Sequence, residues 1–398
     1  MHKNIRVLTW FNFFTDFKLY APIAIIYFAQ VSGSFALGMS IFSIAMISSA
    51  LLEIPTGVFS DRIGRKKTVI LGAMSATCCV VFYAIGQSFW ILVVGALFEG
   101  LSRSFYSGNN DALLYDTLAE KDQTDKYADF LGKTSKMFQL ALAVSAIFGG
   151  LVLIKWAFPV ILWLSVIPQA LCLVLAFMLI EPAIQTRRSG NIYQHLKEAY
   201  FGFIHNKKLR LLSLSSILGY GLGEATYQFH SAFFATVWPV WAIPFSKVLT
   251  NLGATASFHY SGAIIKRFNI FKILIGGNIY FRLMMTVATV FPSILSPIII
   301  SSGSLFYGII QVAKNSLMQK EFKQEQRATM ASLNSFAGNI FFGIVAIFIG
   351  FSADQLSPAK AIIVLQVLQL STLYVYWILF KSQRQNTPPV EAKAGKFI

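Results

Sequence analysis

Long apolar runs alternate with short polar joints along almost the whole chain. A helix needs about 20 apolar residues to cross the hydrocarbon core of a membrane. Lipid offers backbone groups no hydrogen-bond partners, so runs of this length are predicted to be helices. The twelve predicted spans cover residues 5–30, 36–59, 67–86, 89–118, 128–153, 156–180, 209–236, 243–265, 270–290, 294–319, 327–351 and 358–380.

The composition also indicates a membrane protein. Of the 398 residues, 56% are hydrophobic and 13% are charged, whereas soluble domains average about 45–50% and about 25%. The net charge is +16, but no soluble domain remains between the spans to bind nucleic acid. Cys78, Cys79 and Cys172 all lie within apolar runs, which argues against a disulfide framework and a zinc site. We therefore expect a multi-pass protein of the inner or plasma membrane with no cofactor and no metal.

Lysine and arginine gather in every second joint. Because positively charged joints stay in the cytoplasm, both termini are expected there. The longest joint divides the spans six and six. The predicted organisation is an N-terminal six-helix bundle (1–180), a cytoplasmic linker (181–208) and a C-terminal six-helix bundle (209–398). Apolar residues at helical spacing in the linker predict an amphipathic helix on the inner membrane surface, with an ordinary linker as the alternative. These residues are Ile192, Leu196, Ala199, Tyr200, Phe203 and Ile204.

One joint, Gly57–Lys67, reads G-V-F-S-D-R-I-G-R-K-K. Its four cations suit a simple topology anchor, which is one interpretation. Its glycines suit a tight turn and close helix approach, and Asp61 is placed at a helix end, where it can accept bonds from another helix's free N–H groups. The stretch resembles the loop 2–3 signature of the major facilitator superfamily of secondary transporters, G-x-x-x-D-R-x-G-R followed by two basic residues. A faint second copy, Gly262–Lys272, has Lys266 in place of the aspartate.

The resemblance implies an all-α membrane protein with twelve transmembrane helices in two pseudo-symmetric six-helix bundles around a central cavity. It implies transport by alternating access, with Asp61 capping the start of the eleventh span, near residues 326–329, when the carrier faces outward. It also implies that Arg65 pairs with an acidic residue of span 4, for which Asp116 is placed, so that the two halves are held together. The predicted cytoplasmic gate comprises Gly57, Asp61, Arg62, Gly64, Arg65, Asp116 and Glu53.

A small set of ionisable residues lies inside the predicted spans, where a charge costs about 2.5–3.5 kcal/mol. All but Arg282 fall on spans 1, 4, 7 and 10, which line the central cavity in the family that the chain resembles. Glu99 and Arg103 are four residues apart and can pair on one helix face. Asp16 and Glu224 lack such a partner, so they are candidate proton carriers; a cation across the cavity or nearby hydroxyls are the alternative. The cavity and coupling candidates are Asp16, Glu99, Arg103, Asp111, Glu224 and Lys314.

These features predict a secondary active transporter, not an enzyme, that exports small amphipathic molecules by proton coupling. Residues 51–57 (L-L-E-I-P-T-G) and 327–335 (R-A-T-M-A-S-L-N-S) resemble prokaryotic carriers described as drug or small-molecule exporters. The span 5 motif of such exporters is reduced to Gly149-Gly150, so an uptake symporter or uniporter for a small metabolite remains the alternative, followed by a transport-inactive sensor. A P-loop is excluded because Tyr127 stands where its first glycine is required. The predicted partners are a small-molecule substrate and the lipid bilayer, with a proton as coupling ion, and a monomer is expected.

Overall fold

The computed structural model describes residues 3–107, 109–183, 206–321 and 327–386, and these ranges are helical apart from short turns. The side chains of residues 58, 61, 128, 135, 319–321, 327–329 and 383–386 also lie outside this description. The amphipathic helix predicted in the linker falls on residues 184–205, outside the described residues, and stays a prediction.

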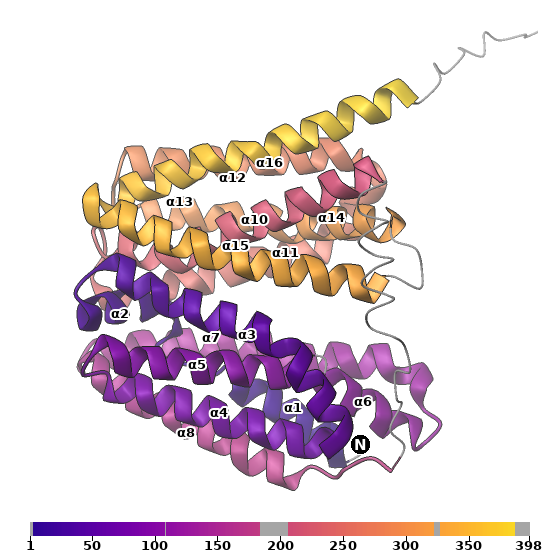
Figure 1. The fold of residues 1–398 in the computed structure, drawn as a ribbon. Coiled ribbons are helices and arrows are strands. Elements are labelled where there is room, and N and C mark those ends of the chain that lie inside the picture. Colours follow the sequence, from indigo (N-terminus) through magenta and orange to yellow (C-terminus); the bar gives the residue numbers. More distant parts are fainter. Residues whose placement is uncertain (1–2, 108, 184–205, 322–326, 387–398) are drawn as a thin grey trace, which may run out of the picture.

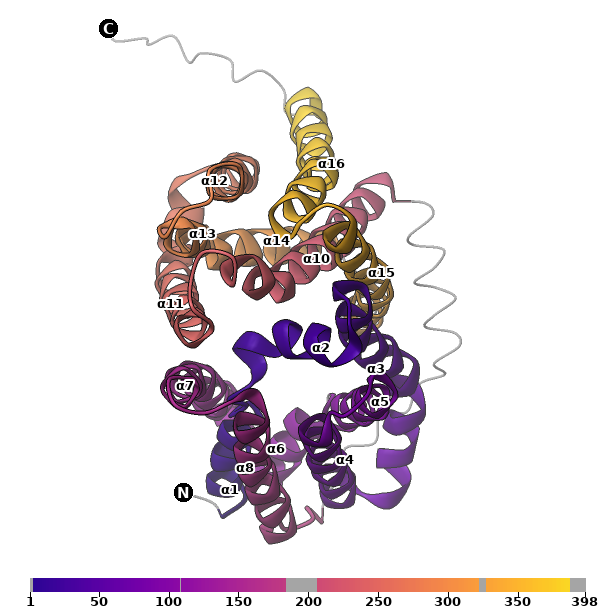
Figure 2. The same ribbon diagram turned by 90° about the vertical axis from the view of Figure 1, so that its left-hand side faces the viewer.

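The helices form two groups that follow one another in the chain (Figures 1 and 2). The first group contains α1 Lys3–Thr15, α2 Ala24–Ser32, α3 Phe35–Ile63, α4 Arg65–Ile85, α5 Phe89–Tyr106, α6 Asn109–Ala119, α7 Tyr127–Leu153 and α8 Phe158–Met178. The second contains α10 Lys207–Phe234, α11 Ile243–Arg267, α12 Ile270–Val290, α13 Ser296–Ser302, α14 Tyr307–Glu321, α15 Arg327–Gln355 and α16 Pro358–Asn386. Short 3-10 segments cover Ala21–Ile23, Thr124–Lys126, Val240–Ala242 and Gly303–Phe306.

Polar cap residues and glycines set many of the helix ends. Ser34 accepts a hydrogen bond from the backbone N–H of Leu37 at the start of α3, and Asn206 does the same for Leu209 at the start of α10. Such caps satisfy N–H groups that have no partner within the helix. Gly33 and Gly86 end α2 and α4 in the left-handed conformation, which glycine adopts without steric cost.

Each of the twelve predicted spans corresponds to one helix or to one interrupted helix among the described residues. Nine described stretches are long and apolar enough to cross a membrane by length and hydropathy alone. The remaining three spans are the interrupted first one, α10 and α11, which contain more polar side chains. The chain is therefore a multi-pass membrane protein.

Three spans predicted as continuous are interrupted. The first breaks at residues 16–20, between α1 and the 3-10 turn that begins at Ala21. Pro22 follows directly, and its missing N–H and fixed backbone angle favour an interruption of the helix here. The fourth is divided into α5 and α6 around Ser107, and the tenth has a 3-10 segment between α13 and α14. These breaks were not predicted, because a hydropathy pattern gives the length of an apolar run but does not report whether the backbone is helical throughout.

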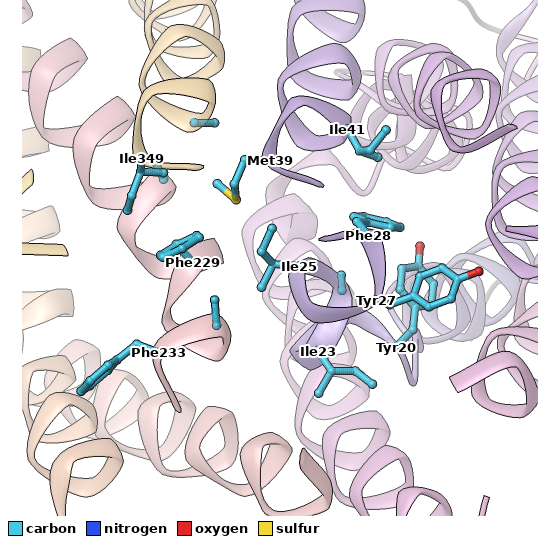
Figure 3. Close-up of a cluster of buried hydrophobic side chains, with 14 of the residues drawn as sticks. Tyr20, Ile23, Ile25, Tyr27, Phe28, Met39, Ile41, Phe229, Phe233 and Ile349 are labelled. Atoms are coloured by element: carbon cyan, nitrogen blue, oxygen red, sulfur yellow. The ribbon is translucent and has the colours of Figure 1, made fainter. Parts of the chain in front are cut away.

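The buried apolar side chains form three clusters, and their placement distinguishes the two ends of the molecule. We call the end with the turn at Gly64 and the starts of α1 and α10 the basic end, and the other the opposite end. The largest cluster, toward the opposite end, combines both groups: Ile25 and Met39 of the first lie near Phe229 and Ile349 of the second (Figure 3). The other two clusters lie toward the basic end, and each belongs to one group only. The groups therefore share a core at the opposite end and have separate cores at the basic end.

Candidate functional site

A cavity of about 680 Å³ lies within the first group of helices. Its walls come from α1, α4, α5, α6, α7 and α8 and from the break after α1. The wall includes acidic and basic side chains: Asp16, Lys18, Glu99, Arg103, Asp111 and Lys136. Ionisable groups at membrane depth are costly, so their convergence on one cavity marks a candidate site for substrate or coupling ions.

From the length of α1, we expect the break in the first span to lie within the hydrocarbon core. The 13 residues of α1 extend about 20 Å at 1.5 Å per residue, against a hydrocarbon core of about 30 Å. The Gln169 side-chain amide donates to the backbone oxygens of Phe14 (3.1 Å) and Thr15 (3.3 Å), which the helix end leaves partly free. The Leu19 N–H donates to Ser165 Oγ at 3.1 Å. Side chains of α8 thus replace the backbone bonds that the break removes, as lipid cannot do.

A charged cluster faces this break from α5. Arg103 donates to Glu99 Oε1 through Nη2 at 2.9 Å and through Nε at 3.2 Å, so the predicted i, i+4 pair is confirmed. Lys18 Nζ lies 3.8 Å from the same oxygen, and Tyr83 Oη donates to Glu99 Oε2 at 3.0 Å. Neither Lys18 nor Tyr83 was predicted as a site residue, although a lysine inside an apolar run is a signal for one. Glu99 is therefore fully engaged by two cations and a phenol.

Asp16 and Asp111 line the same cavity but differ from Glu99. Neither carboxylate forms a hydrogen bond or ion pair with another side chain in the part of the chain that the structure describes. Asp16 is the first residue after the end of α1 and lies in the field of Lys18 and Arg103. The cross-cavity pairing weighed as the alternative for Asp16 is thus not formed here, and its carboxylate is available to a proton or a cation.

The second group of helices contains a smaller polar cluster. Glu224 Oε1 accepts from Gln228 Nε2 at 2.7 Å. Lys247 of α11, which was not among the predicted site residues, is buried. Its Nζ donates to the backbone oxygen of Tyr227 at 2.9 Å and lies 3.4 Å from the centroid of the Tyr227 ring. Lys314 forms no hydrogen bond or ion pair within the described ranges. The predicted candidates Glu224 and Lys314 are therefore not paired with each other.

Arg282, for which the sequence offered no explanation, joins three helices. Its guanidinium donates to Gln369 Oε1 at 2.8 Å and to Thr372 Oγ1 at 3.1 Å, both on α16. Gln369 in turn donates to the Leu222 backbone oxygen and to Thr226 Oγ1 on α10, each at 3.2 Å. The sequence could not indicate these contacts between helices, because the groups that they join are neutral apart from Arg282 and lie 87 or more positions apart. Arg282 has a packing role outside the cavity wall.

The turn at the basic end is held by residues of the first group. Gly64 has φ +99°, and a methyl group on it would lie 2.8 Å from the Glu181 carboxylate. That carboxylate accepts from the N–H groups of Arg65 (2.7 Å) and Lys66 (2.8 Å), the first two residues of α4. A carboxylate at a helix N-terminus is electrostatically favourable. Glu181 is thus a structural partner of the turn that the sequence analysis missed.

The remaining predicted gate residues show a pairing within one group. Arg65 Nε lies 3.6 Å from Asp116 Oδ2, so these two side chains are brought together as the resemblance implied. Both belong to the first group, on α4 and α6, so the pair by itself cannot join the two halves. Glu53 Oε1 accepts from Ser107 Oγ at 2.9 Å, Arg62 is exposed, and a methyl group on Gly57 would meet nothing within 4 Å.

The expectation of close helix contact at Gly57 is therefore wrong for this conformation, because open space surrounds it. Asp61 lies near the end of α3, but its side chain is outside the described residues, as are those of residues 327–329. Capping of the eleventh span by Asp61 stays a prediction.

At the opposite end, a carboxylate joins the two groups directly. The Asp354 oxygens, near the end of α15, accept from the N–H groups of Phe35 (2.8 Å) and Ala36 (2.9 Å) at the start of α3. The helices touch here, since a methyl group on Gly350 would overlap with the Phe35 backbone oxygen. Ser231 Oγ also donates to the Pro22 backbone oxygen. The opposite end is thus closed by contacts between the groups, none of which the sequence indicated.

Comparison with known proteins identifies the family. The sequence profile of the Major Facilitator Superfamily matches residues 7–347. The chain belongs to this superfamily. As a member of it, the protein is a membrane transporter, and the resemblance of the Gly57–Lys67 turn is confirmed at the level of the family.

Several relatives of this superfamily transporter are named in functional terms. An Na(+), Li(+), K(+)/H(+) antiporter of Planococcus maritimus is 26% identical over 179 residues, which is 44% of this chain and 41% of the relative. The chain thus spans about two-fifths of the length of this antiporter and of two uncharacterized transporters of Buchnera aphidicola. The class D tetracycline resistance protein of Salmonella ordonez is 22% identical over 80% of this chain and 81% of its own. An uncharacterized MFS-type transporter of Methanocaldococcus jannaschii is 22% identical over 90% and 94%.

Solved structures share the fold of this transporter. The nucleoside transporter NupG matches with a TM-score of 0.78 at 14% identity, covering 95% of this chain and 99% of its own. A bacterial homolog of the human lysosomal transporter Spinster matches with a TM-score of 0.76, also at 14% identity, covering 96% and 97%. At this identity the likeness establishes the fold and says nothing about the substrate.

Proposed function

We propose that this transporter works by alternating access and exports small amphipathic or cationic molecules in exchange for protons. The observation that supports this most is the cavity at membrane depth, in which Glu99 is neutralised by Arg103 and Lys18 while Asp16 has no partner among the described side chains. A carboxylate in such a setting alternates between binding a proton and binding a cation.

The proposed orientation of the protein in the membrane follows from the distribution of charge. With the basic end in the cytoplasm, as the positive-inside rule requires, both termini are cytoplasmic. The shared core and the Asp354 contacts then close the external side, and this structure corresponds to the inward-facing state. Asp61 is proposed to cap the start of α15 when the basic end closes, after which substrate leaves to the outside.

The names of two relatives guide the choice of substrates to test. One is a monovalent cation/proton antiporter and the other a tetracycline resistance protein. The panel therefore includes Na⁺, Li⁺ and K⁺ together with amphipathic compounds of the tetracycline type.

The test is transport in inside-out vesicles that contain the protein, with an imposed inward-acidic pH gradient. Accumulation of a compound that disappears when the gradient is collapsed supports proton-coupled export. Asp16→Asn is expected to abolish this accumulation, and Asp125→Asn, an exposed carboxylate at the basic end, is the matched control. If no transported compound responds to the gradient, the coupling is wrong; if flux is equal in both directions without it, the protein is a uniporter.

A further inference from the structure

The break in the first span contains a buried oxygen with no partner. Gln169 is 0% exposed, and its Oε1 has no hydrogen-bond partner in the described structure. Its amide cannot be turned around, because Nε2 donates to the carbonyl oxygens of Phe14 and Thr15 and an oxygen there would be repelled. Leaving a buried acceptor unsatisfied costs about 1–3 kcal/mol. The position of Oε1 therefore indicates a ligand that donates or is positively charged.

Further oxygens without donors line the same cavity. Asp16 follows the last residue of α1 and has no side-chain partner among the described residues. Asn110 Oδ1, on α6, is buried and also lacks a hydrogen-bond partner. The C-terminal end of α1 adds the negative end of a helix dipole. Interrupted helices at the membrane midplane are where transporters coordinate their cations.

The surrounding charges limit the charge of the ligand. Lys18 and Arg103 both pair with Glu99, and Asp111 faces the same cavity as Lys136, which leaves Asp16 as the carboxylate without an ion-pair partner among the described residues. No group of three or more His, Cys, Asp or Glu side chains in the described ranges is arranged to hold a metal ion. A site with one full carboxylate and neutral amide oxygens suits a single positive charge better than a double one, which draws on several carboxylates.

We propose that the break in the first span is a binding site for a monovalent cation, liganded by the Asp16 carboxylate and Gln169 Oε1 with Asn110 on the facing wall. The ion is either an inorganic one, such as Na⁺ or K⁺, or the protonated amine of an organic substrate. This rests on the proposed function for its purpose, since a cation at Asp16 competes with the coupling proton, but the binding itself requires no gradient.

The test is equilibrium binding to the purified full chain in detergent at constant ionic strength, followed by thermal unfolding and calorimetry. NaCl, LiCl and KCl form the inorganic arm and methylammonium chloride the organic one. Tetramethylammonium chloride, which has no N–H donor and is too bulky to approach both oxygens, is the reference. We expect saturable binding in at least one arm. Equal unfolding temperatures in all five salts would mean that water alone occupies the site and would overturn the proposal.

Variants separate this site from other cation sites. Asp16→Asn, Gln169→Leu and Asn110→Leu are expected to raise the dissociation constant, the first two at least tenfold. Gln139→Leu changes an exposed amide on the wall of the same cavity and is expected to leave it unchanged. If Gln169→Leu fails to fold, Asp16→Asn and Asn110→Leu still decide the question. Unchanged affinity in Asp16→Asn and Asn110→Leu would refute the assignment.

The two proposals can fail separately. Gradient-driven transport of an amphipathic compound without saturable cation binding would remove only this site. Cation binding that depends on Gln169, without any gradient-driven flux, would keep the site and remove the proton-coupled function.

Discussion

Asp354 is expected to stabilise the state that is closed at the opposite end. Its two oxygens accept from the N–H groups of Phe35 and Ala36 at 2.8 and 2.9 Å. These contacts join α15 to α3 across the interface of the two groups, so they exist only while that end is closed. Asp354→Asn keeps the size of the side chain but removes its charge and one of its two acceptors.

The size of the effect follows from the chemistry of helix N-termini. Capping interactions of this kind stabilise by about 0.5–2 kcal/mol. The Asp354 carboxylate is exposed to solvent, which screens it, so we expect Asp354→Asn to cost about 1 kcal/mol. Such a change alters the ratio of the two states about fivefold. The variant therefore favours the conformation that is open at the opposite end.

The assay is the labelling rate of a cysteine that this conformation exposes. Ser231 is 1% exposed and bonded to the Pro22 backbone oxygen, so Ser231→Cys in a background without Cys78, Cys79 and Cys172 is protected while the end is closed. A membrane-impermeant maleimide added from the opposite end is expected to react about five times faster when Asp354→Asn is also present.

Two controls accompany this measurement. A cysteine at the exposed Ser293 reports the intrinsic reactivity at the same end, and Asp125→Asn removes an exposed carboxylate from the basic end. The labelling rate at position 293 is expected to be the same with and without Asp354→Asn, and Asp125→Asn is expected to leave the rate at position 231 unchanged. An unchanged or slower rate at position 231 in folded Asp354→Asn protein would refute the role given to this carboxylate.

Three further predictions concern stability and transport. Gly64→Ala should lower the unfolding temperature through a loss of about 1–3 kcal/mol, because the new methyl group meets a carboxylate at 2.8 Å and φ is +99°. Gly57→Ala, whose methyl group would meet nothing within 4 Å, should leave the unfolding temperature unchanged. Equal unfolding temperatures for the two variants would contradict this prediction. Arg282→Met should destabilise the folded protein by about 1–3 kcal/mol, because it leaves the Gln369 oxygen unsatisfied. The double variant with Gln369→Leu should recover part of this loss, and additive losses would argue against the network. Asp61→Asn should insert normally but lose transport, so flux equal to that of the unchanged protein at matched expression would show that capping is dispensable.

The sequence indicated the spans, the local pair and, through the family signature, the contact of Arg65 with Asp116, but not the other contacts between distant segments. Each span was visible because burial in lipid requires a continuous apolar run. Glu99 and Arg103 were visible because four residues complete about one helical turn. Asp354 and Glu181 were not, because each caps a helix more than 100 residues away and no local pattern marks such a partner. The break after Thr15 was not predicted, because its charged residues lie within an apolar run that is long enough to cross the membrane as one continuous helix.

The separate cores at the basic end and the shared core at the opposite end give the carrier a temperature dependence. Opening the opposite end exposes apolar side chains, whereas closing the basic end brings together a turn rich in arginine and lysine. The apolar surface exposed at the opposite end is therefore not matched by apolar surface buried at the basic end, and the conformational equilibrium has a heat-capacity change. Because apolar association weakens on cooling, cold should shift the population toward the conformer with the parted outer cluster.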